Sequence, residues 1–338
     1  MNKKIYVIAI FTTLIFIAVG SLIWWVKDRN TNINQMTTVS VRLAWVPGAT
    51  FTGDFVALHK GFWKTEGLDV YLNPGGFELD AIKLVAGGSD TFGITSGPQL
   101  LLARASGFPI VAIGAVIPRS PIGWIAKKDS NIKEPHDFSG KKVGSQFGTH
   151  TEITLEALCG KLGISLNSFK RIPVKFDPRP FIAGEVDVLP VYIIDQPVDL
   201  RRQGIELNII DPGDYGVSLA FGNLYFTTEE TLKNKPEIVR AFLRGAKRGW
   251  LGVNENPNQS VDILSSYVAN ADKETLLAKL NAVLNFIKKS KPTYLGVFPM
   301  TLKEWESTKE ILVRYGNLRS ELNLAQCFTN VYLQENVE

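Results

Sequence analysis

The sequence predicts an α/β protein with two domains, one of them inserted into the other. Residues 40–117 alternate four times between strand-like and helix-like segments, an order typical of a parallel sheet covered by helices. A second alternating series follows a Pro-containing break at residues 118–121 and ends at another break at residues 211–216. We therefore expect an outer domain of residues 40–118 and 216–338, an inserted domain of residues 119–215, and two chain crossings between them. Hinged pairs of domains commonly bind small molecules at their interface.

The first series begins with a strand that ends at Trp45. Val41, Leu43 and Trp45 alternate with smaller or more polar neighbours, which is the period of a strand. The pattern becomes helical over residues 53–60, and Gly61 ends that helix. The later elements of this series are strands at 68–72, 91–94 and 110–117 and helices that end at Ala86 and Gly107. The last of these strands is a continuous apolar run, as expected for burial on both faces.

The second series has the same alternation, and helices dominate after it. Its strands are expected at 122–126, 142–145, 172–175, 186–192 and 207–210, and its helices at 151–162, 180–183 and 196–203. A further strand is expected at 218–227, followed by helices at 236–253, 260–268, 273–288 and 302–315.

Composition favours a globular protein and gives no sign of nucleic-acid binding. The 338 residues are enough for two domains, and the net charge of +4 comes without a long basic run. The two cysteines, Cys159 and Cys327, form no metal or redox motif. Cys159 shares a helical stripe with leucines, so we expect a buried thiol; a disulfide between the two cysteines stays open.

The first 26 residues predict export from the cytoplasm. Lys3 and Lys4 precede an apolar run over residues 5–26, which is long enough to cross a bilayer. We expect this run to be an uncleaved signal anchor; a signal peptide cleaved after Gly20 is the alternative. Residues 27–39 are expected to be a linker. The body of the chain would then lie at the periplasmic or extracytoplasmic face of the inner membrane.

Several motifs resemble a known family. They occur in order along residues 40–260 and are Gly53–Val70, Leu84–Ile94, Ala105–Val111 and Lys128–Gly144. These motifs are similar to those of type II periplasmic solute-binding proteins of the taurine, nitrate and thiamine-pyrimidine group. The resemblance implies a two-domain clamshell that captures a small molecule and delivers it to the permease and ATPase subunits of an ABC importer, without a cofactor.

Within that group the sequence is most similar to binders of thiamine pyrimidine precursors and of riboflavin. The segments Val186–Pro197 and Asp214–Gly216 carry this likeness. The position of Gln196 is often a glutamate in that signature. A glutamine offers a donor as well as an acceptor to a heterocycle, so the resemblance leaves the ring's hydrogen-bond partner open.

The candidate ligand residues are aromatic and polar groups near strand ends and crossings. Five aromatic residues are candidates for stacking on a ligand ring, although each is also a candidate for the core: Trp45, Phe51, Phe147, Tyr192 and Tyr215. The polar and glycine candidates are Thr52, Gly75, Gly76, Ser96, Arg119, His150, Asp195 and Gln196. Asp195 could accept from an exocyclic amine or cap the next helix, and Arg119 could meet the ligand or pin the domains.

Two helix starts bear on the charge of the ligand. Thr149 and Glu152 have capping-box spacing, and the free amides at such a start can hold an anion or serve an ordinary cap. Glu152 there, and Glu78 and Asp80 at the equivalent place in the first domain, disfavour an anion. A neutral or cationic ring is therefore expected over taurine or nitrate.

Two other classes of function compete with solute binding. Pyrimidine phosphate synthases share the expected fold, but Thr95 and Gln99 stand where that resemblance would place a lysine and a histidine. Residues 218–226 also lack the cysteines of those enzymes, so we expect no catalysis and no catalytic or metal-binding residues. A membrane-tethered sensor would need an output domain. Only four residues precede the apolar run, so we expect no output domain in this chain.

Overall fold

The structure is a computed structural model, described here for residues 36–76, 78–175, 177–293, 296–316, 318 and 321–334. The expected anchor at residues 1–26 and residues 27–35 of the expected linker lie outside the described residues. Residues 37–39, also expected in the linker, belong instead to the first strand, Thr37–Arg42. In the described ranges, no helix has the length and hydropathy needed to cross a bilayer.

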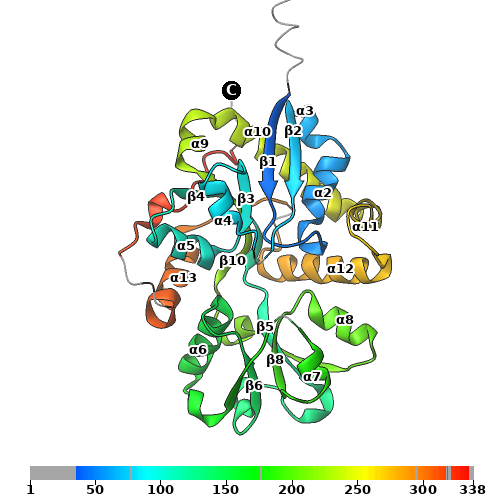
Figure 1. The fold of residues 1–338 in the computed structure, drawn as a ribbon, viewed down its shortest axis with the longest axis vertical. Helices are drawn as coiled ribbons and strands as arrows, with labels where there is room; N and C mark the ends of the chain where they lie inside the picture. The colour runs from blue at the N-terminus through cyan, green and yellow to red at the C-terminus, as the bar shows by residue number, and fades with distance from the viewer. Residues whose placement is uncertain are drawn as a thin grey trace, which may run out of the picture.

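The chain folds into two α/β domains, each built on a five-stranded mixed sheet (Figure 1). The strands of the first sheet, in spatial order, are β2 (Leu68–Asn73), β1 (Thr37–Arg42), β3 (Phe92–Thr95), β10 (Ala220–Thr228) and β4 (Ile110–Arg119). The helices of this domain are α2 (Thr52–His59), α3 (Phe62–Thr65), α4 (Ala81–Ala86), α5 (Gly97–Ala105), α9 (Glu229–Asn234), α10 (Pro236–Glu255), α11 (Pro257–Ser265), α12 (Lys273–Ser290) and α13 (Leu302–Tyr315).

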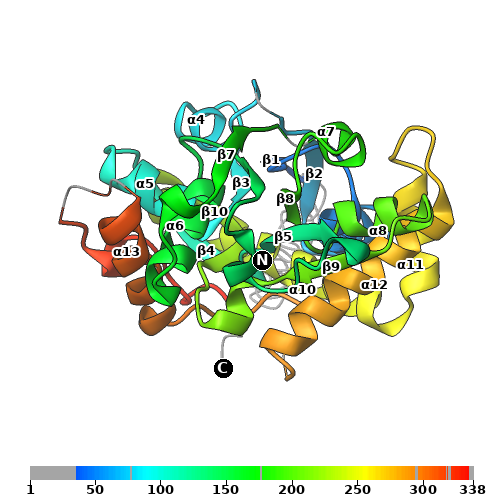
Figure 2. The ribbon, with the colours of Figure 1, turned by 90° about the horizontal axis from the view of Figure 1, so that it is seen from below.

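The second sheet lies between the two chain crossings. Its spatial order is β7 (Lys170–Pro173), β6 (Lys142–Ser145), β8 (Val188–Tyr192), β5 (Ile122–Lys127) and β9 (Leu207–Ile210). Its helices are α6 (His150–Leu162), α7 (Arg179–Ile182) and α8 (Gln196–Arg202). Figure 2 shows α6 and α8 on opposite sides of this domain, with α8 beside α12 of the first domain.

Neither sheet is purely parallel, which corrects the expectation from the alternating pattern. β10 is antiparallel to both β3 and β4, and β5 is antiparallel to both β8 and β9. Each of these two strands follows a chain crossing instead of a helical crossover within its own sheet, so nothing forces it to run parallel. The first strand also differs, because β1 spans Thr37–Arg42 and Trp45 lies three residues beyond its end.

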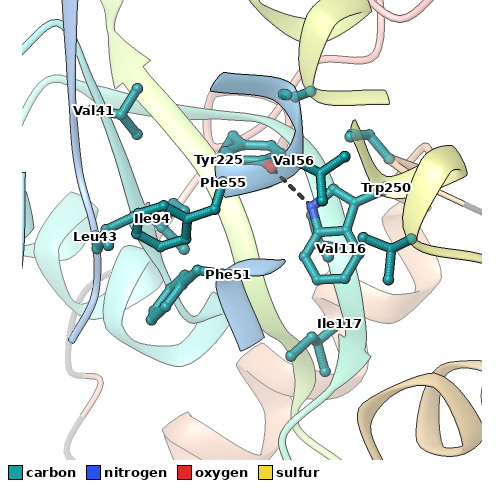
Figure 3. Close-up of a cluster of buried hydrophobic side chains, with 14 of the residues drawn as sticks. Val41, Leu43, Phe51, Phe55, Val56, Ile94, Val116, Ile117, Tyr225 and Trp250 are labelled. Atoms are coloured by element: carbon teal, nitrogen blue, oxygen red, sulfur yellow. Dashed lines mark hydrogen bonds between the residues drawn. The ribbon is translucent and has the colours of Figure 1, made fainter. Parts of the chain in front are cut away.

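The core of the first domain contains a buried hydrogen-bond chain. Tyr225 Oη donates to Asp54 Oδ1 at 2.6 Å. Trp250 Nε1 donates to Tyr225 Oη at 3.1 Å (Figure 3). The helices α2 and α10 approach so closely here that a Cβ on Gly249 would lie 2.1 Å from Gly53 O. Burial raises the pKa of Asp54 to about 7, although the hydrogen bond from Tyr225 opposes this shift. Both cysteines are buried and free, so no disulfide forms.

We predict that the free energy of unfolding of Asp54→Asn will fall less between pH 4 and pH 7 than that of wild type. The pKa of Asp54 is about 7 in the folded state and near 3.8 when unfolded, so the folded state retains a proton that the unfolded state releases. This group therefore stabilises the fold fully below about pH 4, and its contribution declines as the pH rises to about 7. Urea unfolding across this range measures the effect.

The control for this prediction is Asp129→Asn, which changes an exposed carboxyl. The free energy of unfolding of Asp54→Asn relative to wild type should rise with pH, whereas that of the control should not. An equal pH dependence in both variants would contradict the role given to Asp54.

Candidate functional site

The carboxyl ends of strands from both sheets point toward the boundary between the domains. In the first sheet, β4 ends at Arg119 opposite the start of β10, and β3, β1 and β2 run parallel to β4. In the second sheet, β5 starts at Ile122 opposite Tyr192 at the end of β8, and β6 runs parallel to β8. Ligands of open α/β sheets bind at such ends. We call the loops after β1, β2, β3, β6 and β8 the interdomain face (Figure 1).

Trp45 and the glycine loop after β2 form one unit of the interdomain face. Gly75 N donates to Trp45 O at 3.0 Å, and a Cβ on Gly75 would lie 2.1 Å from Leu43 O. Only glycine therefore allows residues 74–76 to lie against this segment. Trp45 is 41% exposed. Gly76 is the next residue after Gly75, which is hydrogen-bonded to the Trp45 backbone.

Ser96 caps a helix at the same face. Its Oγ lies 3.0 Å from Gln99 Oε1 and 3.5 Å from Gln99 N at the start of α5. Thr95 Oγ1 also donates to Gln99 Oε1, at 3.3 Å. These three side chains therefore form a local hydrogen-bonded group at the end of β3.

Phe51 and Thr52 lie in the core instead of on a surface. Phe51 is 3% exposed and belongs to the apolar cluster with Leu43, Phe55 and Ile94 (Figure 3). Thr52 Oγ1 donates to Ala49 O at 2.8 Å. The structure gives both residues a packing role.

Phe147 is an exposed aromatic residue two positions after the end of β6. Its side chain is 50% exposed, and the Arg171 guanidinium carbon lies 5.4 Å from its ring centroid. Arg171 Nη1 in turn donates to Glu152 Oε1 at 2.8 Å. A guanidinium over a ring face stabilises both groups, so Arg171 and Glu152 together hold Phe147 in place.

The start of α6 differs from the capping box that its spacing predicts. Thr149 Oγ1 accepts from Thr151 N at 3.2 Å, but Glu152 pairs with Arg171 and not with the backbone of Thr149. The sequence could not show this, because Arg171 is contributed by β7. His150 is the first residue of α6, and burial lowers its pKa to about 4, so its imidazole is neutral at pH 7.

The loop after β8 is engaged in structural contacts. Gln196 Oε1 accepts from Tyr192 N at 2.8 Å. Asp195 stands at the N-cap position of α8 without capping it, and its Oδ1 lies 2.6 Å from Lys279 Nζ on α12. A ligand amine that binds Asp195 would therefore compete with Lys279 for the carboxylate. Burial raises the pKa of Tyr192 to about 12, so its phenol stays protonated.

Arg119 and Tyr215 lie near the crossings. Arg119 donates through Nη1 and Nη2 to Asp211 at 2.9 and 2.6 Å, and its guanidinium carbon lies 4.1 Å from the Phe286 ring centroid. Tyr215 packs against the apolar cluster on the α6 side of the second sheet, where burial and nearby carboxylates such as Glu134 raise its pKa.

The sequence did not single out Gln146 as a site residue. Its side-chain nitrogen and oxygen are both buried and without a hydrogen-bond partner. The available signal was its place between the end of β6 and the exposed Phe147. Among the described residues, no group of three or more His, Cys, Asp or Glu side chains is arranged to hold a metal ion.

We predict that Lys279→Met will destabilise the contact between the two domains. The loss leaves Asp195 and Asp199, 2.6 and 2.7 Å from Lys279 Nζ, as unpaired neighbours. Because these carboxylates are about two-fifths exposed, the cost is expected near 1 kcal/mol rather than that of a fully buried pair. Chemical denaturation in low salt measures it.

Lys273→Met provides the matched control on the same helix. Lys273 pairs with Asp262 within the first domain, and both side chains are about 60% exposed. The control should change the free energy of unfolding much less. Equal effects of the two substitutions would contradict a special role for the contact between α8 and α12.

Comparison with known proteins is consistent with this arrangement. A family model described as "NMT1/THI5 like" matches residues 49–260, which is more than half of the chain. The riboflavin-binding protein RibY of Chloroflexus aurantiacus is 27% identical, over 87% of this chain and 86% of that protein. The formylaminopyrimidine-binding protein of Halalkalibacterium halodurans is 27% identical, over 78% of each chain.

Relatives with enzyme names and solved structures also match. The 4-amino-5-hydroxymethyl-2-methylpyrimidine phosphate synthase of Legionella pneumophila is 25% identical, over 88% of this chain and 92% of that enzyme. The periplasmic aliphatic sulphonate binding protein SsuA of Escherichia coli aligns with a TM-score of 0.70 at 15% identity, over 88% of this chain and 99% of that one. That likeness shows the two-domain periplasmic-binding-protein fold.

Proposed function

Because the chain belongs to the NMT1/THI5-like family of solute-binding proteins, we propose that it is the substrate-binding component of an ABC-type importer and holds a planar nitrogen heterocycle between its domains. The observation that carries this proposal is a pair of exposed aromatic side chains at facing strand ends. Trp45 follows β1 of the first domain, and Phe147 follows β6 of the second. A flat ring between the domains can stack on both.

The helix starts near these rings disfavour an anionic ligand and leave a neutral or cationic ring as the favoured class. Asp80 Oδ1 already accepts from Ile82 N and Lys83 N at the start of α4, and Thr149 caps α6. Three of the amides that could otherwise hold an anion, those of Ile82, Lys83 and Thr151, are therefore occupied. His150 adds no positive charge at pH 7. Nitrate, taurine and other sulfonates are poorer candidates for this reason.

The ligand class that we favour is a thiamine pyrimidine precursor, such as hydroxymethylpyrimidine or its formylamino analogue. The names of two relatives, a formylaminopyrimidine binder and a riboflavin binder, support this class and make riboflavin the alternative. The permease and ATPase subunits of the importer would be the protein partners. Residues 5–26 would attach the protein to the extracytoplasmic face of the membrane.

A pyrimidine phosphate synthase is the alternative of another class, and the residues disfavour it. Thr95 and Gln99 occupy positions where the resemblance would place a lysine and a histidine, and they are hydrogen-bonded to each other. Neither side chain is an effective nucleophile or general base at neutral pH. Several relatives are named as pyrimidine phosphate synthases, which is the observation that supports this alternative.

We predict that titration calorimetry on the full-length protein will detect binding of a pyrimidine precursor or riboflavin in the micromolar range or tighter, about −8 kcal/mol. Trp45→Ala and Phe147→Ala should each weaken binding by about 1–3 kcal/mol, because each removes buried apolar area from the complex. Tyr71→Ala is the control, since Tyr71 is 55% exposed but lies within β2 and not at its end.

The outcomes separate the ligand class from the site. Tight binding of taurine with no binding of any heterocycle would show that the ligand class is wrong. Binding of a heterocycle that is equally strong in all three variants would show that Trp45 and Phe147 do not form the site.

A further inference from the structure

Buried polar side chains without partners gather at the start of α6. In the part of the chain that the structure describes, eight buried side-chain nitrogen or oxygen atoms have no hydrogen-bond partner. Five of the eight belong to residues 145–152: Ser145 Oγ, Gln146 Nε2 and Oε1, Thr151 Oγ1 and Glu152 Oε2. Folded proteins pair the large majority of such groups, so a concentration in one place indicates a partner that binds there.

The local fold explains why these side chains come together. Val143 of β6 packs in the same apolar cluster as Leu155 and Leu158 of α6, and strand alternation places Ser145 on that face as well. Gln146 follows directly, and Thr151 and Glu152 are in the first turn of α6. The polar atoms thus lie between the carboxyl end of β6 and the start of α6, next to the exposed Phe147.

The charge of this cluster is negative, which identifies the kind of partner. Arg171 Nη1 lies 2.8 Å from Glu152 Oε1 and 3.8 Å from Glu156 Oε1, so two carboxylates share one cation. Burial and the charge of Glu152 raise the pKa of Glu156, although Arg171 opposes this shift. The remaining oxygen of Glu152 therefore needs a hydrogen-bond donor, and an anion would meet repulsion.

We propose that Gln146 and Glu152 determine specificity by recognising a ligand edge that carries N–H donors. This inference rests on the proposed function, in which the ring stacks between Trp45 and Phe147. Glu152 Oε2 accepts from an N–H of the ligand. The Gln146 amide, which turns on three rotatable bonds, pairs with a neighbouring donor and acceptor on the same edge. Ligands that offer only acceptors, such as nitrate and sulfonates without an amine, leave Glu152 Oε2 unsatisfied.

Matched probes with and without the donor test this inference by calorimetry on the full-length protein. The first pair is 4-amino-5-hydroxymethyl-2-methylpyrimidine and the analogue with hydrogen in place of the amine. The second pair is riboflavin and its 3-methyl derivative, which lacks the ring N–H. Wild type should prefer the donor-bearing member of the pair that it binds by about tenfold or more, which corresponds to about 1.4 kcal/mol.

Glu152→Gln and Gln146→Leu should abolish this preference. In Glu152→Gln the amide oxygen can still pair with Arg171, so the amide nitrogen is turned toward the donor of the ligand. We expect affinity for the donor-bearing probe to fall about tenfold while the other probe changes less than about twofold. Glu156→Gln is the control, one turn along the same helix, and should keep the preference. Thermal unfolding verifies that each variant folds.

Each contrary outcome has its own meaning. Equal losses for both members of a pair would show that Glu152 acts only by holding Arg171 and Phe147, and would overturn the inference. An unchanged preference in both variants would show that buried water satisfies the cluster, and would overturn it as well. If wild type binds neither pair, the proposed function fails and this inference fails with it.

Discussion

The ion pair between Arg119 and Asp211 is the interaction on which the arrangement of the two domains depends. Arg119 ends β4 at the first crossing, Asp211 follows β9 at the second, and two hydrogen bonds of 2.9 and 2.6 Å join them. The Phe286 ring of α12 lies against the same guanidinium. Both side chains are nearly buried, so losing either partner would leave a costly unpaired charge. The pair ties both crossings to one helix, and this keeps the strand ends of the two sheets facing each other.

A second set of charges extends this contact along α8 and α12. Lys279 joins Asp195 and Asp199, and Arg202 lies 3.0 Å from Asp272. Two residues considered as ligand contacts, Arg119 and Asp195, therefore hold the domains in this structure. In the proposed site the ligand would instead contact the exposed Trp45 and Phe147 and the polar cluster of residues 145–152. Arg119 and Asp195 are engaged in the domain contact, whereas the charged residue of the proposed site is Glu152.

The sequence predicted the order of strands and helices because periodicity and Pro- or Gly-rich breaks are local signals. It did not predict the direction of β5 and β10, since their partners are set after the chain crosses between domains. Among the site residues, it could not separate exposed Trp45 from buried Phe51, because both are aromatic residues in one short segment. It also assigned Glu152 to a capping box, whereas Arg171, 19 residues away, takes that carboxylate.

The crystal structure of the full-length protein with its tightest-binding heterocycle tests the central claim most directly. We predict a ring that contacts Trp45 of the first domain and Phe147 of the second, with its N–H edge toward Gln146 and Glu152. A ligand bound instead in the groove lined by Val111, Glu229 and Tyr332, on the side of the first domain, would contradict it.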